Sequence, residues 1–257
     1  MHTNHNIPKT ERIGTIVRSN QGELVKCIDY ANARSITIEF CETGYVTKTE
    51  WSKFIRGSVR DVLYPSVYGI ACFGDGPYTA SCPAYRRWFD MVRRCYDPKW
   101  QNTHPAYVGT QVCEEWLNYQ NFAKWYEQQN LADDIDWELD KDLLHKGQKV
   151  YSPANCCFLP TELNLIISTK KAIRGDYPIG VSVDPTNPKK YLARLTDNSR
   201  INGTYKFYKL CDTPEEAFAY YKVEKEKWIK EQAEKFKRVL DPRAYEALMH
   251  YEILITD

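Results

Sequence analysis

Side chains that could support metal-dependent chemistry are concentrated between residues 139 and 164. The segment 139–147 reads LDKDLLHKG, in which Asp140 and Asp142 enclose a lysine and His145 follows closely. Two amide side chains, Asn155 and Asn164, come next. Carboxylate and amide oxygens can bind divalent cations, and a histidine can move a proton. The segment is therefore the first candidate for a catalytic site.

The elements that must position these side chains follow from local patterns. The apolar residues before Asp140 predict a strand that ends at this acid, and a loop with Gly147 follows. The run CCFL at 156–159 predicts a second strand, and Thr161 is a candidate N-cap for a helix that carries Asn164. Two strands and a helix are therefore expected here.

This order of elements carries a family resemblance. With Asn155 placed 14 residues after Lys141, and Asn164 nine residues after Asn155, the segment resembles the ββα-metal finger of HNH nucleases, in particular the phage homing-endonuclease variant with Asn in the last position. The resemblance implies that Asp140 and Asn164 bind Mg²⁺ or Mn²⁺ and that Asn155 holds the base and the loop. In that family a histidine after the aspartate deprotonates the attacking water, while the metal stabilises the leaving oxygen.

The sequence departs from the family at the position of the base. Lys141 stands where the histidine is expected, and a lysine between two acids is a poor base. His145, four residues on, is the alternative base. Three interpretations stay open: an active nuclease, a fold retained without catalysis, and a hairpin with a helix that holds no site.

Cysteines could supply a different metal site. Cys95, Cys113, Cys156, Cys157 and His104 could lie near one another, but there is no C-x₂-C pair, and adjacent cysteines point to opposite faces of a strand. Nine cysteines without regular short spacing are typical of reduced thiols in the cytoplasm. Buried thiols are therefore favoured over structural zinc.

Residues 174–236 predict a second module of three antiparallel strands and one helix. The strands are RGDYPIGVSVD, KKYLARLTD and GTYKFYKLC, and the helix begins at the capping box 213–216. With the tight start at Gly180 and the strand 191–194, this set is similar to the DNA-binding domain of plant ethylene-response (Apetala-type) factors, which also occurs in phage HNH homing endonucleases. The resemblance implies a sheet that lies in the major groove.

Strand alternation places Arg194 on one face of its strand and Tyr191 and Ala193 on the other. The resemblance makes Arg194 the first candidate for a base or phosphate contact. Its candidate companions are Arg174, Ser182, Lys189, Lys190, Tyr191, Lys206 and Tyr208.

A helix predicted over 83–97 adds four arginines. Its apolar stripe is formed by Tyr85, Trp88, Val92 and Cys95. The arginines lie off this stripe in pairs seven residues apart, a spacing of about 10 Å that suits phosphates. They are Arg86, Arg87, Arg93 and Arg94. The alternative is a salt-bridged face in which Asp90 lies between the pairs.

Charge is uneven along the chain. Residues 111–142 carry nine acids and two bases, a net charge of −7, whereas residues 143–210 carry eleven bases and four acids, or +7. A local basic block can bind nucleic acid although the whole chain carries only +1. The alternative is a solvated lysine-rich surface.

Composition and pattern together predict an α+β protein with three parts. The 257 residues are 43% apolar and 27% charged, as in soluble globular proteins, and no apolar run has the length of a membrane helix. We expect a β-rich module and linker at 1–78, a helical and HNH-like region at 79–172, and an Apetala-type domain with a helical tail at 173–257. In the middle region, the apolar residues of 113–130 are expected in the core.

These observations predict a phage-type DNA-binding protein of the HNH homing-endonuclease class that nicks duplex DNA with Mg²⁺ or Mn²⁺, as a monomer or a homodimer in the cytoplasm of a bacterial host. The alternative is a catalytically inactive protein that binds DNA or a host protein complex as a regulator or an inhibitor of host defence. A third interpretation is a structural protein with incidental basic strands.

Overall fold

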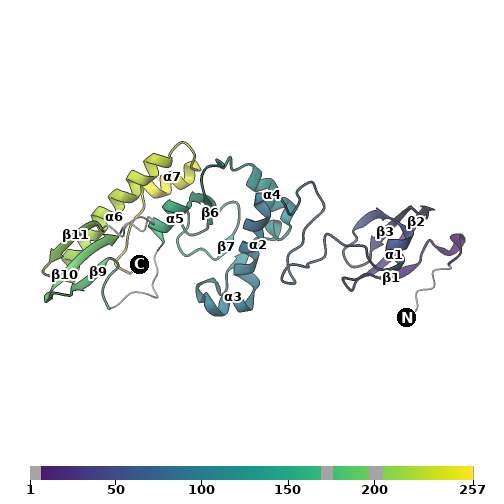
Figure 1. Cartoon of the computed structure of the whole chain (residues 1–257), viewed down its shortest axis with the longest axis horizontal. Helices are drawn as coiled ribbons and strands as arrows, with labels where there is room; N and C mark the ends of the chain where they lie inside the picture. Colours follow the sequence, from purple (N-terminus) through teal and green to yellow (C-terminus); the bar gives the residue numbers. More distant parts are fainter. Residues whose placement is uncertain (1–6, 169–175, 197–204, 257) are drawn as a thin grey trace. The chain divides into compact units, whose positions relative to one another are not determined.

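The computed structural model describes residues 7–168, 176–196 and 205–256 of the chain (Figure 1). These residues form two compact units, Met1–Tyr126 and Glu127–Asp257, so the division falls inside the region predicted as the middle domain. Helices and several antiparallel sheets are both present, and the predicted α+β class is confirmed.

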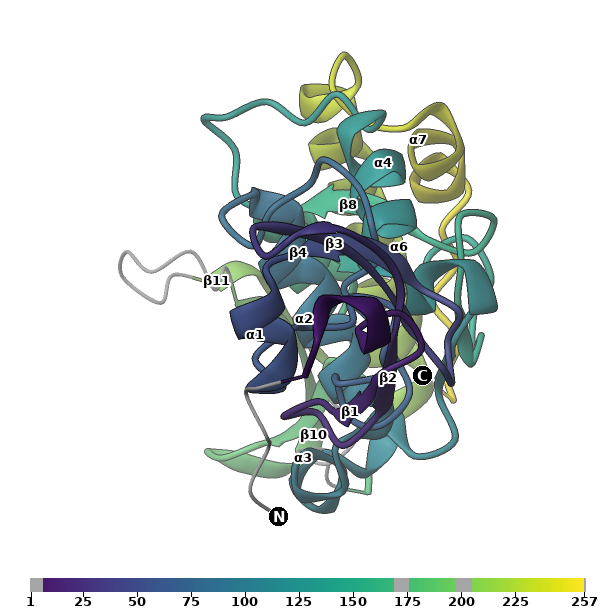
Figure 2. The ribbon, with the colours of Figure 1, turned by 90° about the vertical axis from the view of Figure 1, so that its right-hand side faces the viewer.

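The first unit begins with a four-stranded antiparallel sheet in the order β1-β2-β3-β4 (Figure 2). Its strands are β1 (Ile16–Arg18), β2 (Leu24–Asn32), β3 (Ser35–Phe40) and β4 (Val46–Thr49), with a short 3-10 helix η1 (Lys9–Glu11) before them and α1 (Trp51–Ile55) after them. Alternate residues of β3 are buried, as expected for a half-buried strand. The inner face packs with α1 into one apolar core.

The remainder of this unit is mainly helical from residue 83 onward. It contains α2 (Pro83–Tyr96), α3 (Pro98–Thr103), η2 (Pro105–Tyr107), β5 (Gln111–Val112), η3 (Glu114–Leu117) and α4 (Tyr119–Glu127). The expected stripe of α2 is buried at Trp88, Val92 and Cys95. The Trp88 indole donates a 2.7 Å hydrogen bond to the Trp116 carbonyl, which joins α2 to η3. Of the residues of 113–130 predicted to lie in the core, Trp116, Tyr119, Phe122 and Ala123 are buried, whereas Tyr126 is half-buried.

The second unit begins with the predicted hairpin and helix. Strands β6 (Trp137–Asp140) and β8 (Cys157–Pro160) pair antiparallel, so that Asp140 lies opposite Cys157. Helix α5 (Thr161–Ile167) packs against both strands, and β7 (Val150–Tyr151) lies in the connection between them. The prediction of Thr161 as N-cap is wrong. This residue is the first of the helix, and its hydroxyl donates to the carbonyl of Asp136 at 3.0 Å.

The C-terminal module has the predicted three strands and helix. Strands β9 (Val181–Asp184), β10 (Asn187–Thr196) and β11 (Tyr205–Cys211) form an antiparallel sheet in the order β11-β10-β9, against which α6 (Pro214–Phe236) packs. The Thr213 hydroxyl accepts the N–H of Glu216 at 3.2 Å, and Pro214 occupies the first helical position, as the capping box predicts. The tail forms α7 (Pro242–Met249), which contacts α6.

No helix in the described ranges has the length and apolar character needed to cross a membrane.

Candidate nucleic-acid interface and ββα site

The C-terminal sheet has one face packed on α6 and one face turned away from it. On β11, the Phe207 ring contacts the rings of Tyr220 and Tyr221 of α6, with centroids 5.7 and 6.0 Å apart. Odd-numbered side chains of β11 therefore face the helix, and even-numbered ones face away. Because Arg194 of β10 lies directly opposite Tyr208 of β11, both side chains belong to the face away from α6.

This outer face combines the guanidinium of Arg194 with aromatic and apolar surface. The Tyr208 side chain is 60% exposed, Arg194 is exposed, and the Arg194 guanidinium makes no hydrogen bond or ion pair with any described residue. Leu192 lies between Leu210 on one side and Ser182 on the other. Leu192 itself is buried, at 8% exposed, so the exposed part of this face is formed by Arg194, Tyr208 and Leu210. We call these five side chains, Ser182, Leu192, Arg194, Tyr208 and Leu210, the outer-face cluster.

The other residues expected to accompany Arg194 have different surroundings. Lys190 forms an ion pair with Asp212, whose hydrogen bond and charge raise the lysine pKa. Tyr191 faces the α6 side and packs on Tyr177, with ring centroids 5.4 Å apart, so it does not join the outer-face cluster. Lys189 is exposed near the start of β10. Arg174 and the side chain of Lys206 lie outside the described residues.

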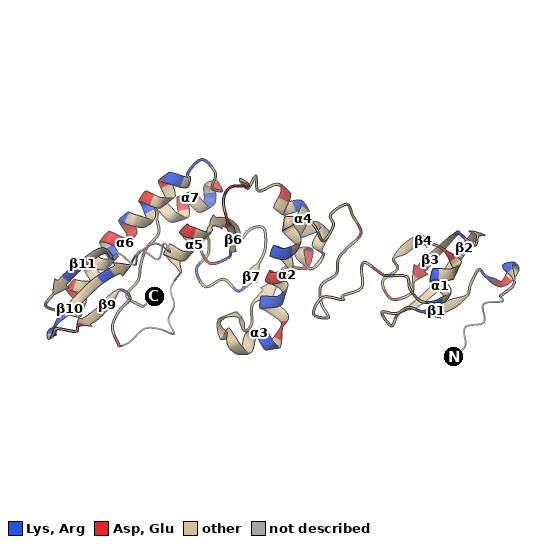
Figure 3. Cartoon of the chain, in the orientation of Figure 1, with Lys and Arg blue, Asp and Glu red and all other residues tan. Residues whose placement is uncertain are grey.

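Figure 3 marks the positions of charged residues along α2. The four arginines of this helix are mostly engaged in packing and pairing. The Arg93 guanidinium forms a 3.1 Å ion pair with Asp90 and lies 4.3 Å from the Trp100 ring centroid. Arg94 lies 5.9 Å from the Tyr107 ring centroid, and Arg87 is half-buried. The Arg86 side chain is 88% exposed and approaches Asp90 at 4.0 Å. Because Arg86 and Arg93 both approach Asp90, these contacts favour the alternative of a salt-bridged helix face over a set of arginines that bind phosphates.

The ββα region brings the two expected metal ligands onto packed elements. The Asp140 Oδ1 accepts the backbone N–H groups of Asp142 and Leu143 at 2.9 and 2.6 Å, which closes a tight turn after β6. Burial raises the pKa of this carboxyl group. Its second oxygen has no hydrogen-bond partner among the described residues. Asn164 is half-buried on α5.

Lys141, at the position of the expected base, is held in an ion pair. Its ammonium donates to both carboxylate oxygens of Asp142, at 2.7 and 2.8 Å, and its side chain is only 10% exposed. It also lies 5.8 Å from the ring centroid of Tyr151. An ammonium bound in this way is a structural cation, because a base needs a free lone pair.

The two remaining residues of the expected constellation lie in the connection between the strands. His145 is exposed, and its carbonyl accepts the N–H of Gln148 at 3.0 Å. The Asn155 amide donates to the carbonyl of Val150 at 3.0 Å and so ties the start of β7 to the segment just before β8. Asn155 thus braces the loop.

Sequence reasoning missed Arg243, at the start of α7. Its guanidinium donates to the carbonyls of Pro153, Ala154 and Cys156, at 3.2, 3.3 and 3.3 Å, and also pairs with Asp241. Although burial alone would raise the pKa of Asp241, the hydrogen bonds and charge of Arg243 lower it. Arg243 therefore clamps the loop that contains Asn155. The only local signal is the Asp-Pro-Arg helix start, which cannot reveal a partner so distant in sequence.

The donor set of this region fits a cation only when other ligands complete it. In the described ranges, no three His, Cys, Asp or Glu side chains are grouped to hold a metal ion. Asp140 would contribute one carboxylate oxygen and Asn164 one amide oxygen. Mg²⁺ tolerates such a small set where phosphate oxygens and waters fill its remaining positions. Burial raises the pKa of Cys157 beside this turn, so its sulfur is a neutral thiol.

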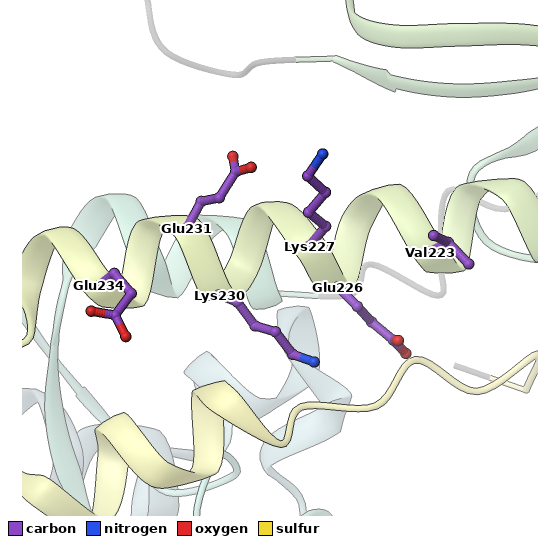
Figure 4. A pocket seen from close by; sticks show the side chains of 6 residues that line it. All are labelled: Val223, Glu226, Lys227, Lys230, Glu231 and Glu234. Carbon is purple, nitrogen blue, oxygen red and sulfur yellow. The ribbon is translucent and has the colours of Figure 1, made fainter.

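A shallow groove of about 550 Å³ lies along α6 (Figure 4). Its lining mixes signs, with three glutamates and two lysines beside Val223. One of the glutamates, Glu226, accepts the N–H of Ile253 at 2.9 Å and pairs with Lys222, so it anchors the tail. The groove is a charged helix surface with no convergent set of functional groups.

No family model matches the chain, and no curated protein or solved structure is significantly similar to it. Function is therefore inferred from the residues and their geometry.

Proposed function

We propose that the chain is a duplex-DNA-binding protein that contacts DNA through the outer-face cluster of its C-terminal sheet. The observation that carries this proposal is the exposed Arg194 directly opposite the exposed Tyr208, on the face away from α6. A guanidinium with several unused donors binds phosphate oxygens or a guanine edge, and the tyrosine supplies a flat surface and a hydroxyl.

The ββα region supports a binding role over a cleaving one. The Lys141–Asp142 ion pair occupies the place of the base, and Arg243 and Asn155 hold the neighbouring loop. These contacts stabilise a scaffold, and the Lys141 ammonium, which donates to Asp142, has no lone pair with which to accept a proton from water. In this proposal the region orients the C-terminal module and does not cleave.

The test is the affinity of the full chain for a fluorescent duplex of about 30 base pairs, measured by anisotropy between about 50 and 200 mM salt. We expect Arg194→Ala to weaken binding about 5- to 100-fold and to reduce the salt slope by about one. Arg238→Ala is the matched control, because Arg238 is also exposed and lies after α6, away from the outer-face cluster in the sequence. It should change the affinity less than about twofold. Equal losses in the two variants would contradict the proposal, as would wild-type binding that does not depend on salt.

Metal-dependent nicking is the second candidate, and the packed hairpin and helix favour it. The arrangement leaves one oxygen of Asp140 available beside α5, where Asn164 lies. The assay measures the nicking of supercoiled plasmid by wild type, Asp140→Ala and Lys141→His in the presence of Mg²⁺ or Mn²⁺. Nicking that Asp140→Ala loses would support this candidate, and a gain in Lys141→His would identify the missing base. Intact plasmid with all three proteins would exclude it.

A further inference from the structure

An arginine side chain is enclosed by two aromatic rings in the N-terminal sheet unit. The Arg12 guanidinium carbon lies 4.9 Å from the ring centroid of Tyr30 and 4.8 Å from that of Trp51. The two rings are nearly perpendicular, at 87°, with centroids 5.9 Å apart. Tyr30 comes from β2 and Trp51 begins α1, so the sheet and the helix form this aromatic corner together.

The corner holds the cation without a carboxylate. Arg12 donates through Nε to the Ile7 carbonyl at 3.1 Å and through Nη1 to the Tyr30 hydroxyl. In the part of the chain that the structure describes, it forms no ion pair with an acid. Recognition therefore rests on two ring faces, one hydroxyl and one carbonyl, a combination suited to a guanidinium group.

Arg12 reaches the corner from a short segment outside the sheet. Arg12 directly follows η1, which lies before β1, and its backbone N–H donates to the carbonyl of Lys9. Two residues later, the Gly14 N–H donates to the carbonyl of Cys27 in β2, so the backbone is tied to the sheet and exchange concerns the Arg12 side chain alone. The corner itself belongs to β2 and α1, whose core contains Trp51 and Phe54. The ring faces can therefore persist when Arg12 is exchanged for another cation.

We propose that the aromatic corner of Tyr30 and Trp51 is a binding site for an arginine side chain of a partner protein, and that Arg12 occupies it as an internal ligand. An attached ligand acts at an effective concentration of about a millimolar, so an incoming arginine must compete with it. The exposed apolar side chains of Ile13 and Ile16, which follow Arg12 closely, offer further contact area to such a partner. This site is independent of the DNA-binding proposal.

The test observes the Trp51 indole N–H of the full chain by NMR, with its signal assigned by its loss in Trp51→Phe. The probe is a capped glycine–arginine–glycine tripeptide, and the matched control has citrulline in place of arginine, which keeps the shape without the charge. In Arg12→Ala, we expect the arginine probe to move this signal saturably, at concentrations about tenfold or more below those that wild type requires. The citrulline probe should leave it unmoved, because the ring faces attract the charge.

Two further variants separate the contributions of the corner. Tyr30→Phe keeps the ring face and loses the hydroxyl, so it should weaken the response severalfold in the Arg12→Ala background. Tyr30→Leu removes the face and should abolish it. If a variant unfolds, wild type is tested instead at high probe concentration, because displacement of the Arg12 side chain by the probe should shift the same Trp51 signal. The proposal is overturned if, in folded protein, the arginine probe does not shift the Trp51 signal, or if the citrulline probe shifts it equally.

Discussion

At the scale of single residues, the most unusual environment belongs to Glu23, at the start of β2. Its side chain is 1% exposed, and neither carboxyl oxygen has a hydrogen-bond partner among the described residues. The buried Asp61 lies beside it. The Asp61 carboxylate accepts hydrogen bonds from the Thr43 hydroxyl and from the Leu63 N–H. Burial, followed by the charges of Asp61 and Glu42, raises the pKa of Glu23 to about 7. Once protonated, Glu23 can donate to Asp61.

Glu23→Gln is expected to remove part of the pH dependence of stability. The pKa of Glu23 is about 7 in the folded chain against the ordinary 4.5, so its proton stabilises the fold fully below pH 4.5. This stabilisation is lost as pH rises through 7. At about pH 8 the variant should be more stable than wild type, by up to about 3 kcal/mol. Urea unfolding of the full chain between about pH 5 and 8 measures this difference.

Glu42→Gln serves as the control for this prediction. Glu42 is an exposed neighbour that contributes to the same pKa through its charge alone. Its substitution should change the free energy of unfolding by less than about 0.5 kcal/mol. If Glu23→Gln and wild type show the same pH dependence, Glu23 is ionised in the folded chain and the assignment is wrong.

At the scale of elements, Gly180 determines how closely the C-terminal sheet approaches α6. Its φ is +75°, and a Cβ atom at this position would lie 2.1 Å from Cδ2 of Tyr221. Gly147 provides a comparison in the same unit, because its φ is +78° and a Cβ atom added there would meet nothing within 4 Å. Both glycines have a positive φ, which L side chains rarely adopt, but only at Gly180 would an added Cβ atom meet a neighbouring side chain, that of Tyr221.

Gly180→Ala is therefore expected to destabilise the second unit far more than Gly147→Ala. The left-handed backbone alone costs about 1–2 kcal/mol for an alanine, and overpacking against the Tyr221 ring adds about 1–3 kcal/mol. Urea unfolding of both variants, followed by hydrogen exchange in β9, β10 and α6, measures the difference. Equal losses of stability would show that Tyr221 moves aside freely.

Local sequence patterns are sufficient to predict most of these elements. The alternation in β3, the proline start of α2 and the capping box of α6 each involve neighbours within a few residues, so they are visible without a structure. The prediction of Thr161 as a cap is wrong because its hydroxyl finds the Asp136 carbonyl, 25 residues earlier in the chain. A propensity rule contains no information about such a partner.

The candidate sites are less predictable, because distant contacts decide them. The acids around Lys141 are visible in the sequence, but the burial that makes the Lys141–Asp142 pair structural comes from packing. The Arg243 clamp joins residues about 90 positions apart. Strand alternation, in contrast, correctly separates Arg194 from Tyr191, because a side-chain period of two is a local property.

At the scale of the whole molecule, each of the two units has its own buried interior. The first contains the core formed by β2, β3 and α1, and the second buries Leu163 of α5 and Ile229 of α6. Glu23 and the aromatic corner belong to the first unit, and the outer-face cluster belongs to the second. The proposed binding of a protein arginine and of DNA is therefore divided between the two units.

This division predicts that the two units respond to mutation independently. In the double variant Glu23→Gln/Arg194→Ala, DNA affinity should match that of Arg194→Ala within about twofold, and the pH dependence of unfolding should match that of Glu23→Gln within about 0.5 kcal/mol. This result is expected because Glu23 and Arg194 belong to different units, so a proton lost at Glu23 leaves Arg194 in place on its strand. Anisotropy measures the affinity, and hydrogen exchange resolved by peptide assigns the unfolding to each unit. A change of more than about tenfold in DNA affinity from Glu23→Gln alone, equivalent to about 1.4 kcal/mol, would instead show that the first unit takes part in DNA binding.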